Sequence, residues 1–588
     1  MKHSRSLVCC LSLSLWFLLS ADSLRGETYT FFSGTQYPLQ VYFLEGDLPG
    51  PTVMVQGGIQ GDESAGFITA QILTRSRVYR GNLLIVPRAN IPSILLRKRA
   101  VNVDMNRRFD RDYNGFYEDR LARVIRLLVS QSDAFIHLHE GSGFYHPQYI
   151  DGTRNPGRFG QSIVIDAPVL WKDGGAGAIS LAQTVSAVLD DLNPEILPPW
   201  YRFNLFSTNT LARDTLHPEQ RKSLTCYALS NVGIPAVAIE VSKNIEEKAW
   251  KVVHQLRAVE LFLRRFGVEI APAAVTAADF RQYPPKDVSL LVNGQRLTSA
   301  TRKPLWLDPD SHLSLAVNPE SASELFAPEW AVFASDRPGI NLLRAPRLSL
   351  QTFENLEVLA DGIKLGRIPV LWKSDRANPA AARPGMFACW LNRQLRLVSD
   401  GETLEAVEGD QLILDGVCGS RRGEVLNFKG YVSRSGASSG QDIGAEIILD
   451  PANFLSQYRL DSRSAQENRY EVVRETPGMP KSRFLVRIVP RQVREVVLVN
   501  TAGRTLSLDA TQAQEQVLPE GTYALKELRG NGSREGVTVM IDRRPIAWGG
   551  RFPLYAGGRL NLSFYQSTTF LPIGRFALTG AKSTHPLD

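Results

Sequence analysis

The stretch Pro51-Thr52-Val53-Met54-Val55-Gln56-Gly57-Gly58-Ile59-Gln60-Gly61-Asp62-Glu63 decides the fold of the first half of this chain. Its apolar beginning is typical of a buried strand, and the residues from Ser64 to Ala70 are typical of the start of a helix. Two adjacent glycines permit a tight turn between them. Gln60 and Glu63 lie three positions apart on the first helical turn, so their side chains can converge on one point. An amide oxygen and a carboxylate that meet there indicate a metal-hydrolase site.

Strand-like and helix-like patterns alternate around this stretch, from about residue 28 to about residue 268. The expected strands are Thr52–Val55, Asn82–Val86, Ala134–Leu138, Ser162–Asp166 and Ala236–Val241. Amphipathic helix periodicity runs from Leu121 to Leu128 and from Ala249 to Leu263. Apolar strands with intervening helices predict an α/β domain whose sheet is covered on both faces. Ligand sites in such sheets lie at the carboxyl ends of strands, where Gln60, His139 and Glu240 fall.

The pattern changes after Ala271-Pro272-Ala273-Ala274 to short alternating segments with turn residues, such as Asn293-Gly294. A second break is the Pro/Ala-rich stretch from Asn378 to Pro384. We therefore predict a first domain at residues 27–270. We expect small β-rich domains, resembling sandwiches or barrels, at residues 275–373, 385–487 and 488–588.

Length and charge narrow the class of protein. At 588 residues the chain is too long for a single core. A net charge of +7 is modest for this size, and without clustered Lys/Arg or basic-aromatic stripes it gives no indication of nucleic-acid binding. Lys2, His3 and Arg5 precede the apolar run Leu7–Leu19, which is typical of an export signal over residues 1–26. We expect a periplasmic or other extracytoplasmic protein without a membrane anchor after cleavage; an uncleaved anchor is the alternative.

Three cysteines follow the expected signal: Cys226, Cys389 and Cys418. Cys389 and Cys418 lie in the same strand-rich region and could pair in an oxidising compartment. Two buried, unpaired thiols are an equally good interpretation.

Three further segments contain candidate active-site residues in addition to those of the opening stretch. The expected strand Asp133–His139 places His137 and His139 on one face and runs directly into Glu140-Gly141. The expected strand Pro235–Glu240 brings a carboxylate, Glu240, into an apolar run, where an unpaired charge is costly and usually functional. Between them lies Asp104-Met105-Asn106-Arg107, preceded by Arg97-Lys98-Arg99.

Together these motifs resemble the zinc metallocarboxypeptidase superfamily, whose pattern is His-x-x-Glu, Asn-Arg, His and Glu in that order. Gln60 departs from the general pattern. One branch, the murein D,L-carboxypeptidases that shape helical and curved bacterial cells, carries glutamine there. Gly58-Ile59-Gln60-Gly61-Asp62-Glu63 and the run from His137 to Tyr145 are similar to that branch. The resemblance implies an α/β metallocarboxypeptidase-like domain, with a mixed sheet flanked by helices, followed by two or three small β-rich domains.

The resemblance also implies roles for individual residues. Gln60, Glu63 and His139 would bind one zinc ion per chain, and Glu240 would be the general base. Asn106 and Arg107 would hold the terminal carboxylate of the substrate. Arg99, or failing it Arg97, would stabilise the oxyanion. His137, Phe159, Gln161 and Thr225 would contact the substrate, although a packed histidine is nearly as good an interpretation of His137.

The implied function is removal of a terminal diaminopimelate-type residue from a peptidoglycan stem tripeptide, with an effect on cell shape. Muropeptide would be the partner. Two alternatives stay open: a zinc-dependent amino-acid deacylase, because similar Gly-Gly-x-His-Gly-Asp-Glu strings occur there, and a murein-binding scaffold without catalysis.

Overall fold

The computed structural model describes the chain from residue 26 to residue 582 with several gaps. The described residues are 26–171, 177–285, 288–298, 304–307, 314–319, 325–335, 340–344, 353–373, 385–418, 424–432, 440–460, 468–511, 515–542 and 544–582. The expected export signal and the Pro/Ala-rich stretch at 378–384 lie outside these residues. Among the described residues, no helix has the length and apolar character that a membrane span requires.

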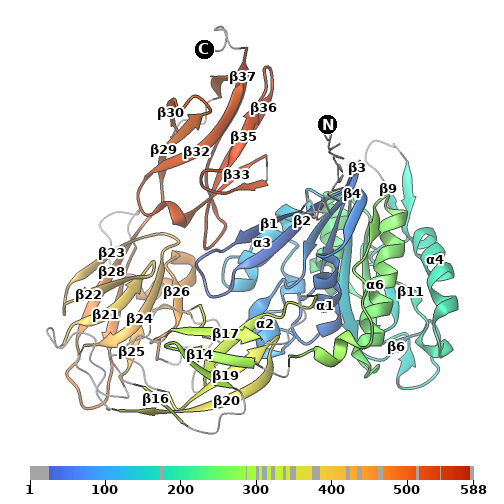
Figure 1. Ribbon diagram of the computed structural model, residues 1–588, viewed down its shortest axis with the longest axis horizontal. Helices are drawn as coiled ribbons and strands as arrows, with labels where there is room; N and C mark the ends of the chain where they lie inside the picture. The colour runs from blue at the N-terminus through green and yellow to red at the C-terminus, as the bar shows by residue number, and fades with distance from the viewer. Residues whose placement is uncertain are drawn as a thin grey trace, which may run out of the picture.

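A nine-stranded mixed sheet organises the first domain (Figure 1), in the order β1-β2-β4-β3-β5-β12-β8-β11, with β13 also on β4. Its strands are β1 (Gly26–Phe31), β2 (Leu39–Glu45), β3 (Leu48–Gln56), β4 (Arg77–Val86), β5 (Ala134–Gly141), β8 (Ser162–Ile165), β11 (Asn204–Ser207), β12 (Ala236–Ser242) and β13 (Glu269–Ala271). The central strands β4, β3, β5 and β12 run parallel, whereas β12 and β8 are antiparallel. All five expected strands are confirmed.

Helices cover both faces of this sheet. They are α1 (Ser64–Leu73), α2 (Ile91–Leu96), α3 (Tyr117–Val129), α4 (Leu181–Leu192), α5 (Leu224–Tyr227) and α6 (Lys248–Arg265). α1, α4 and α6 pack on the face that presents Val53, Val55 and Ile136. α3 packs on the other face, against Met54 and Phe135. Because side chains alternate along a strand, one continuous apolar run supplies both cores. Two further short ribbons pair β6 (Phe144–Tyr145) with β7 (Arg154–Asn155) and β9 (Val169–Trp171) with β10 (Ala178–Ser180).

The turn between β3 and α1 depends on glycine at two positions. Gly58 has φ of +68°, in the left-handed region that disfavours other residues. At Gly61 a Cβ atom would lie 2.0 Å from the carbonyl oxygen of Ser93, so the turn packs directly on the backbone of α2. The chain is thereby forced to present Gln60 and Glu63 at the carboxyl end of the sheet.

Three smaller β-rich blocks follow, each with its own apolar core. The first contains β14 (Val288–Val292), β15 (Gln295–Thr298), β16 (Leu305–Leu307), β17 (Leu315–Pro319), β18 (Trp330–Ala334), β19 (Asn355–Ala360) and β20 (Ile363–Trp372). The second contains β21 (Phe387–Leu391), β22 (Gln394–Val398), β23 (Thr403–Val407), β24 (Gln411–Val417), β25 (Leu426–Phe428), β26 (Glu446–Ile448), β27 (Asn468–Arg474) and β28 (Arg483–Val489). The third contains β29 (Val493–Asn500), β30 (Thr505–Asp509), β31 (Gln516–Pro519), β32 (Gly521–Gly530), β33 (Val537–Ile541), β34 (Arg544–Ile546), β35 (Arg551–Leu554), β36 (Arg559–Gln566) and β37 (Pro572–Ala581).

The predicted fold class is therefore confirmed, with three β-rich blocks, but two of the expected boundaries need correction. The boundary between residues 487 and 488 falls inside β28, whose pairing with β23 and β27 extends to Val489. The expected end of the first domain at residue 270 falls inside β13, which pairs with β4. Both boundaries were placed by changes in composition, which do not register strand pairing.

Each β-rich block contacts the first domain through polar groups. Asp361, at the β19–β20 turn, accepts hydrogen bonds of 2.8 and 2.9 Å from the buried Arg88 guanidinium. Glu446 Oε1 accepts from the backbone N–H of Gln36 at 2.9 Å. Arg123 donates to the backbone carbonyl of Thr569. The described cysteines, Cys226, Cys389 and Cys418, are all buried and free, which fits the second interpretation of the Cys389–Cys418 region.

Candidate active site

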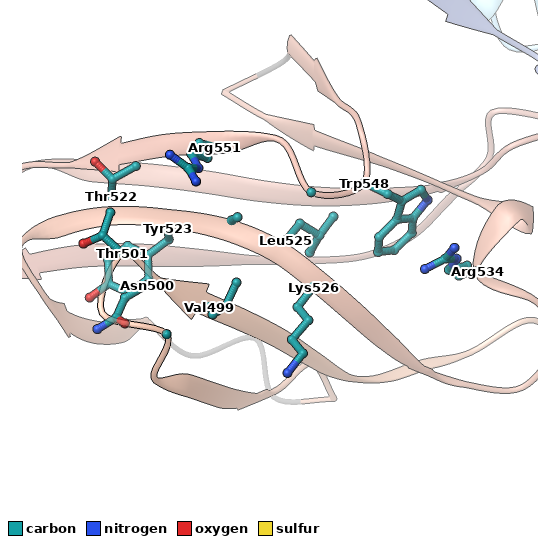
Figure 2. A pocket seen from close by; sticks show the side chains of 13 residues that line it. Val499, Asn500, Thr501, Thr522, Tyr523, Leu525, Lys526, Arg534, Trp548 and Arg551 are labelled. Carbon is teal, nitrogen blue, oxygen red and sulfur yellow. The ribbon is translucent and has the colours of Figure 1, made fainter.

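Two of the cavities differ in the chemistry that they offer. A hollow of about 580 Å³ lies on the C-terminal block, where β32 passes Trp548 (Figure 2). Its lining includes no carboxylate or imidazole. The ionisable side chains along its wall are Tyr523, Lys526, Arg534 and Arg551. A second cavity, of about 250 Å³, lies at the carboxyl ends of the central strands of the nine-stranded sheet. Acids, bases and an imidazole meet there, so the second cavity is the candidate active site.

Most of the residues predicted from the sequence line this second cavity. They are Gln60, Glu63, Arg99, Asn106, Arg107, His139, Phe159, Thr225 and Glu240. They come from the β3–α1 turn, the segment after α2, β5, the segment between β7 and β8, α5, and β12. The sheet and its connecting segments thus bring together side chains that are up to 180 positions apart in the chain.

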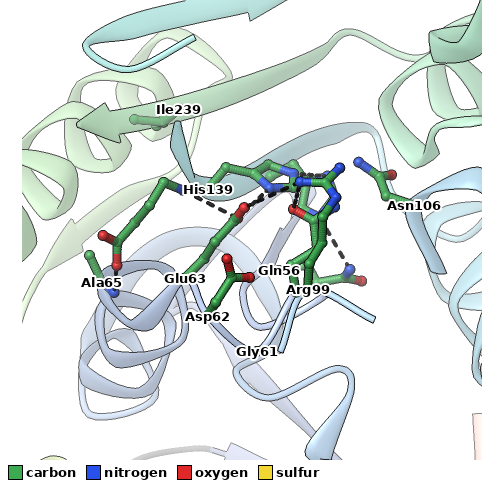
Figure 3. Close-up of polar contacts among 12 residues, drawn as sticks. Gln56, Gly61, Asp62, Glu63, Ala65, Arg99, Asn106, His139 and Ile239 are labelled. Carbon is green, nitrogen blue, oxygen red and sulfur yellow. Dashed lines mark hydrogen bonds and ion pairs between the residues drawn. The ribbon is translucent and has the colours of Figure 1, made fainter. Parts of the chain in front are cut away.

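Glu63 and His139 form the centre of the site (Figure 3). Glu63 Oε2 lies 2.8 Å from His139 Nδ1 and also accepts from the backbone N–H of Glu140 at 3.2 Å. Burial lowers the pKa of His139, but the Glu63 carboxylate outweighs it and raises that pKa above its ordinary value. The 2.8 Å contact is a hydrogen bond between His139 Nδ1 and the Glu63 carboxylate.

A chain of hydrogen bonds behind His139 fixes which of its nitrogens faces Glu63. His139 Nε2 lies 3.1 Å from His137 Nδ1, and His137 Nε2 lies 3.4 Å from the amide nitrogen of Gln56. The Gln56 oxygen is buried without a partner among the described residues. When the Gln56 amide is turned by 180°, its oxygen takes the place of its nitrogen and accepts a hydrogen bond from His137 Nε2–H. His137 Nδ1 in turn accepts from His139 Nε2–H, which leaves Nδ1 as the nitrogen of His139 that faces Glu63.

Gln60 is held by two charged neighbours. Its Nε2 donates to Asp104 Oδ1 at 3.2 Å, and its Oε1 accepts from Arg99 Nη1 at 3.0 Å. Arg99 in turn donates to Asp104 Oδ2 from Nε and Nη2, at 3.1 and 2.9 Å. Burial works against ionisation of Asp104, but Arg99 holds the pKa of that carboxyl below its usual value. Asp104 thereby sets the amide of Gln60 with its oxygen away from Asp104.

The donor set fits a divalent metal ion. Arg99 Nη1 lies 3.0 Å from Gln60 Oε1 and 3.9 Å from Glu63 Oε1, so these two oxygens already face one cationic group. His139 Nδ1 supplies a nitrogen on the other side of Glu63. Among the described residues no three His, Cys, Asp or Glu side chains are grouped to hold a metal. The third donor of this group is the amide of Gln60, which lies outside those four residue types.

Glu240 lies beside this group on the neighbouring strand. In the parallel pairing of β12 with β5, Glu240 is the direct partner of His139. Burial raises the pKa of Glu240 to about 7, with His139 opposing and Glu63 adding to the effect. A carboxylate with that pKa can both accept and return a proton near neutral pH.

Asn106 and Arg107 lie on a short turn, η1 (Met105–Arg107), at the other side of the cavity. Asn106 Oδ1 accepts from the backbone N–H of Leu224 at 3.0 Å, so its Nδ2 is the end left for a ligand. Burial lowers the pKa of the Arg107 guanidinium. A partly desolvated cation next to an amide donor suits a carboxylate ligand.

Three predicted residues lie elsewhere. His137 is fully buried and does not line the cavity, so it supports His139 rather than contacting substrate. Gln161 is also fully buried; its Oε1 accepts from the backbone N–H of Ser242 at 2.9 Å, and its Nε2 donates to the Tyr201 carbonyl. Both ends of its amide are thus bonded within the protein, and its expected substrate contact stays a prediction. Arg97 ends α2 with φ of +51° and, unlike Arg99, is not part of the cavity wall.

The sequence interpretation missed four charged residues around the site. Asp104 orients Gln60 and Arg99. Glu140 accepts from the Ala65 N–H at 2.5 Å and pairs with Lys251 at 2.6 Å, which caps α1 and seats the turn that bears Glu63. Lys243 pairs with Asp62 at 2.5 Å, and Asp166 lines the inner wall. Glu140 directly follows His139, and Asp104 lies two positions before Asn106; these positions are the only signal that pointed to the two acids.

Comparisons with known proteins agree with this geometry. Residues 41–285 match the family described as "Carboxypeptidase controlling helical cell shape catalytic". A curated N-alpha-acetyl-L-2,4-diaminobutyric acid deacetylase from Halomonas elongata is 34% identical over 99 residues. That alignment covers 16% of this chain and 29% of the deacetylase, so the chain spans less than a third of this relative.

Solved structures of the Csd4 protein from Helicobacter pylori are also similar. The tripeptide-bound cell shape determinant is 20% identical, with a TM-score of 0.44, covering 75% of this chain and 96% of that one. The mDAP-bound form, described as a D,L-carboxypeptidase, is 21% identical with the same TM-score, covering 75% and 97%. The family match spans the whole candidate site, from Gln60 to Glu240. Residues 41–285 thus resemble the catalytic domain of the carboxypeptidases that control helical cell shape.

Proposed function

We propose that this chain is an extracytoplasmic, zinc-dependent D,L-carboxypeptidase that shortens a peptidoglycan stem tripeptide to a dipeptide. One observation carries the proposal: within a domain of the cell-shape carboxypeptidase family, a single cavity unites an amide, a carboxylate and an imidazole with a separate base and a carboxylate clamp. The loss of the terminal diaminopimelate-type residue would change the peptides available for cross-linking, and hence cell shape.

Zinc suits the donor set, with Gln60 Oε1, Glu63 and His139 Nδ1 as its protein ligands. When bound, the ion polarises the scissile carbonyl and makes water more acidic. The Gln56–His137 chain would keep His139 in the tautomer that offers Nδ1, and Asp104 would keep the oxygen of Gln60 available.

The residues of this chain account for binding and proton transfer. Arg107 and Asn106 hold the terminal carboxylate of the peptide. Glu240 takes a proton from water as the oxygen of that water bonds to the carbonyl carbon. Arg99 donates hydrogen bonds to the oxyanion that forms. Glu240 then returns the proton to the amine nitrogen as the carbon–nitrogen bond breaks, so one water is consumed and two products leave.

The test is product analysis by mass spectrometry. Purified protein, loaded with zinc, is incubated with muropeptides of dipeptide, tripeptide, tetrapeptide and pentapeptide stems. We expect only the tripeptide to be shortened, by one residue. Unchanged muropeptides in every sample would contradict the proposal, and retention of the muropeptides without product would identify a binding scaffold instead.

A deacylase is the second candidate, favoured by the 34% identity to the Halomonas elongata deacetylase over 99 residues. Both reactions hydrolyse an amide beside a carboxylate-bearing group, so the same cavity could serve either. Incubation with N-acetylated diamino acids separates them: acetate release without tripeptide cleavage would favour the deacylase.

A further inference from the structure

Asp166 is a buried carboxylate in the wall of the candidate active site to which the mechanism above assigns no role. It directly follows β8, and its residue is 3% exposed. Thr210 Oγ1 donates to Asp166 Oδ1 at 2.6 Å, and the Thr225 hydroxyl also bonds to the carboxylate. These partners are neutral. In the described part of the chain, Asp166 has no ion-pair partner within 4.0 Å.

The other carboxylates of the cavity have either a cation or a chemical role. Glu63 contacts His139 and faces Arg99 and Lys243, and Glu140 pairs with Lys251. Glu240 is the proposed base. Asp166 is thus the one remaining acid among the described residues of this wall. A buried charge without a counter-charge is costly, so a bound ligand that supplied the missing positive charge would stabilise the ionised form of Asp166.

The position of Asp166 matches the side chain of the substrate's last residue. Once Arg107 and Asn106 hold the terminal carboxylate, that side chain must extend into the inner part of the cavity. Val164 and Ala238, which are partners across β8 and β12, form an apolar wall there, and Asp166 and Thr225 lie beside it. Arg107 lines the same cavity as Asp166, and its charge acts against the rise in the pKa of Asp166.

We propose that Asp166 is a specificity residue that binds an ammonium group on the side chain of the substrate's C-terminal residue. This inference rests on the proposed carboxypeptidase function, because it names the side chain that the same cavity selects. A diamino acid at the C-terminus would satisfy both the clamp and Asp166, whereas a residue with an uncharged side chain would leave the carboxylate buried and unpaired. Burial raises the pKa of Asp166, although the two hydroxyl partners and Arg107 act in the opposite direction. A bound cation would favour the ionised form of this carboxyl.

The experiment compares two tripeptides that differ in one ammonium group. One ends in diaminopimelate and the other in 2-aminopimelate, which keeps the distal carboxylate and lacks the distal amine. For the wild type we expect kcat/KM to favour diaminopimelate by about a hundredfold or more, since a site built to bind a polar group rejects an analogue without it. In Asp166→Asn this ratio should fall to within a few-fold of one. Asp190→Asn, on the exposed surface of α4, is the matched control and should keep the wild-type ratio.

An unchanged ratio in Asp166→Asn would overturn the proposal, even if both rates fell, because Asp166 would then act only by positioning Arg107. If the wild type cleaves neither tripeptide, the proposed hydrolysis fails, and calorimetry with the two free amino acids decides about Asp166. Tighter binding of diaminopimelate to the wild type, lost in Asp166→Asn, would support the assignment. Equal binding of both amino acids would overturn it.

Discussion

Glu240 lies directly opposite His139 in the parallel pairing of β12 with β5. The backbone of the sheet therefore fixes the distance between the proposed base and the proposed metal ligand. Because Glu240 is not one of the proposed ligands, its chemistry can be removed without emptying the metal site.

In Glu240→Gln we expect kcat to fall by about 10²–10⁴-fold, the range typical of a lost general base, with unchanged zinc content. Stopped assays on the tripeptide and metal analysis of the same preparation measure the two quantities. Glu246→Gln, at an exposed position after β12, is the control and should retain full activity. Turnover of Glu240→Gln within tenfold of the wild type would remove the assigned role.

Replacing Gln60 by histidine should strengthen zinc binding. An imidazole is a stronger zinc donor than a neutral amide, and Asp104 could accept a hydrogen bond from its second nitrogen, as it now does from the amide. We expect the zinc dissociation constant of Gln60→His to fall by about tenfold or more, measured by competition with a chelator. Gln282→His, on the surface, controls for adventitious zinc binding by an added histidine. Loss of metal from Gln60→His would refute the assigned geometry.

Removal of the Gln56 amide should weaken zinc binding without touching a ligand. In Gln56→Leu, His137 loses the acceptor that fixes its tautomer, and His139 no longer holds its Nδ1 lone pair toward the metal. Zinc affinity should drop by about 10–100-fold, as is typical for the partners of a metal-bound histidine. Gln56→Glu, which still offers an acceptor oxygen, should bind zinc nearly as the wild type does. Equal affinities in all three proteins would exclude the hydrogen-bond chain as a determinant.

Asp166→Asn should make the protein more stable near neutral pH. Burial raises the folded pKa of this carboxyl, so its ionised form destabilises the fold at pH values above the unfolded pKa, and this cost disappears as the pH falls below it. The neutral amide avoids the cost. We therefore expect a higher thermal midpoint for the variant at pH 7, with the difference lost near pH 3. A midpoint at pH 7 equal to or below that of the wild type would contradict the assignment.

The ion pair between Arg88 and Asp361 should contribute more to the free energy of unfolding than a surface ion pair does. Arg88 is buried, and in Asp361→Ala its guanidinium would lose its counter-charge, which costs about 3–5 kcal/mol for a buried pair. Urea unfolding followed by tryptophan fluorescence should show the first transition shifted accordingly. Glu357→Gln removes a partner of the exposed Lys364 on the same pair of strands and should cost only about 0–1 kcal/mol. Equal effects of the two substitutions would contradict this ranking.

The sequence predicted the parts of the site that regular structure controls. The apolar runs before Gln60, His139 and Glu240 show where strands end, and parallel strands bring those ends to one edge of the sheet. The segment from residue 97 to residue 108 has no such period, so Asp104 was missed although it lies only two positions before Asn106. A short irregular segment is fixed by side-chain hydrogen bonds, here those of Arg99 and Gln60, and these cannot be inferred from spacing.

Asp166 and Gln161 illustrate a second limit. Both flank β8, which runs antiparallel to β12, so one side chain reaches the cavity and the other is packed beneath Ser242. The neighbouring residues in the sequence do not indicate the direction of that strand within the sheet. The sequence also did not show how far β28 extends. Its pairing with β23 continues to Val489, past the expected boundary at residue 487.

The contacts of Gln36, Arg88 and Arg123 with three separate β-rich blocks have a practical consequence for dissecting this enzyme. A fragment cut after residue 285 would lose these partners of two guanidinium groups, those of Arg88 and Arg123, and of the backbone N–H of Gln36. Such a truncation tests folding before it tests catalysis. The three β-rich blocks supply hydrogen-bond partners to the first domain, so they are better regarded as structural parts of it than as independent domains on flexible linkers.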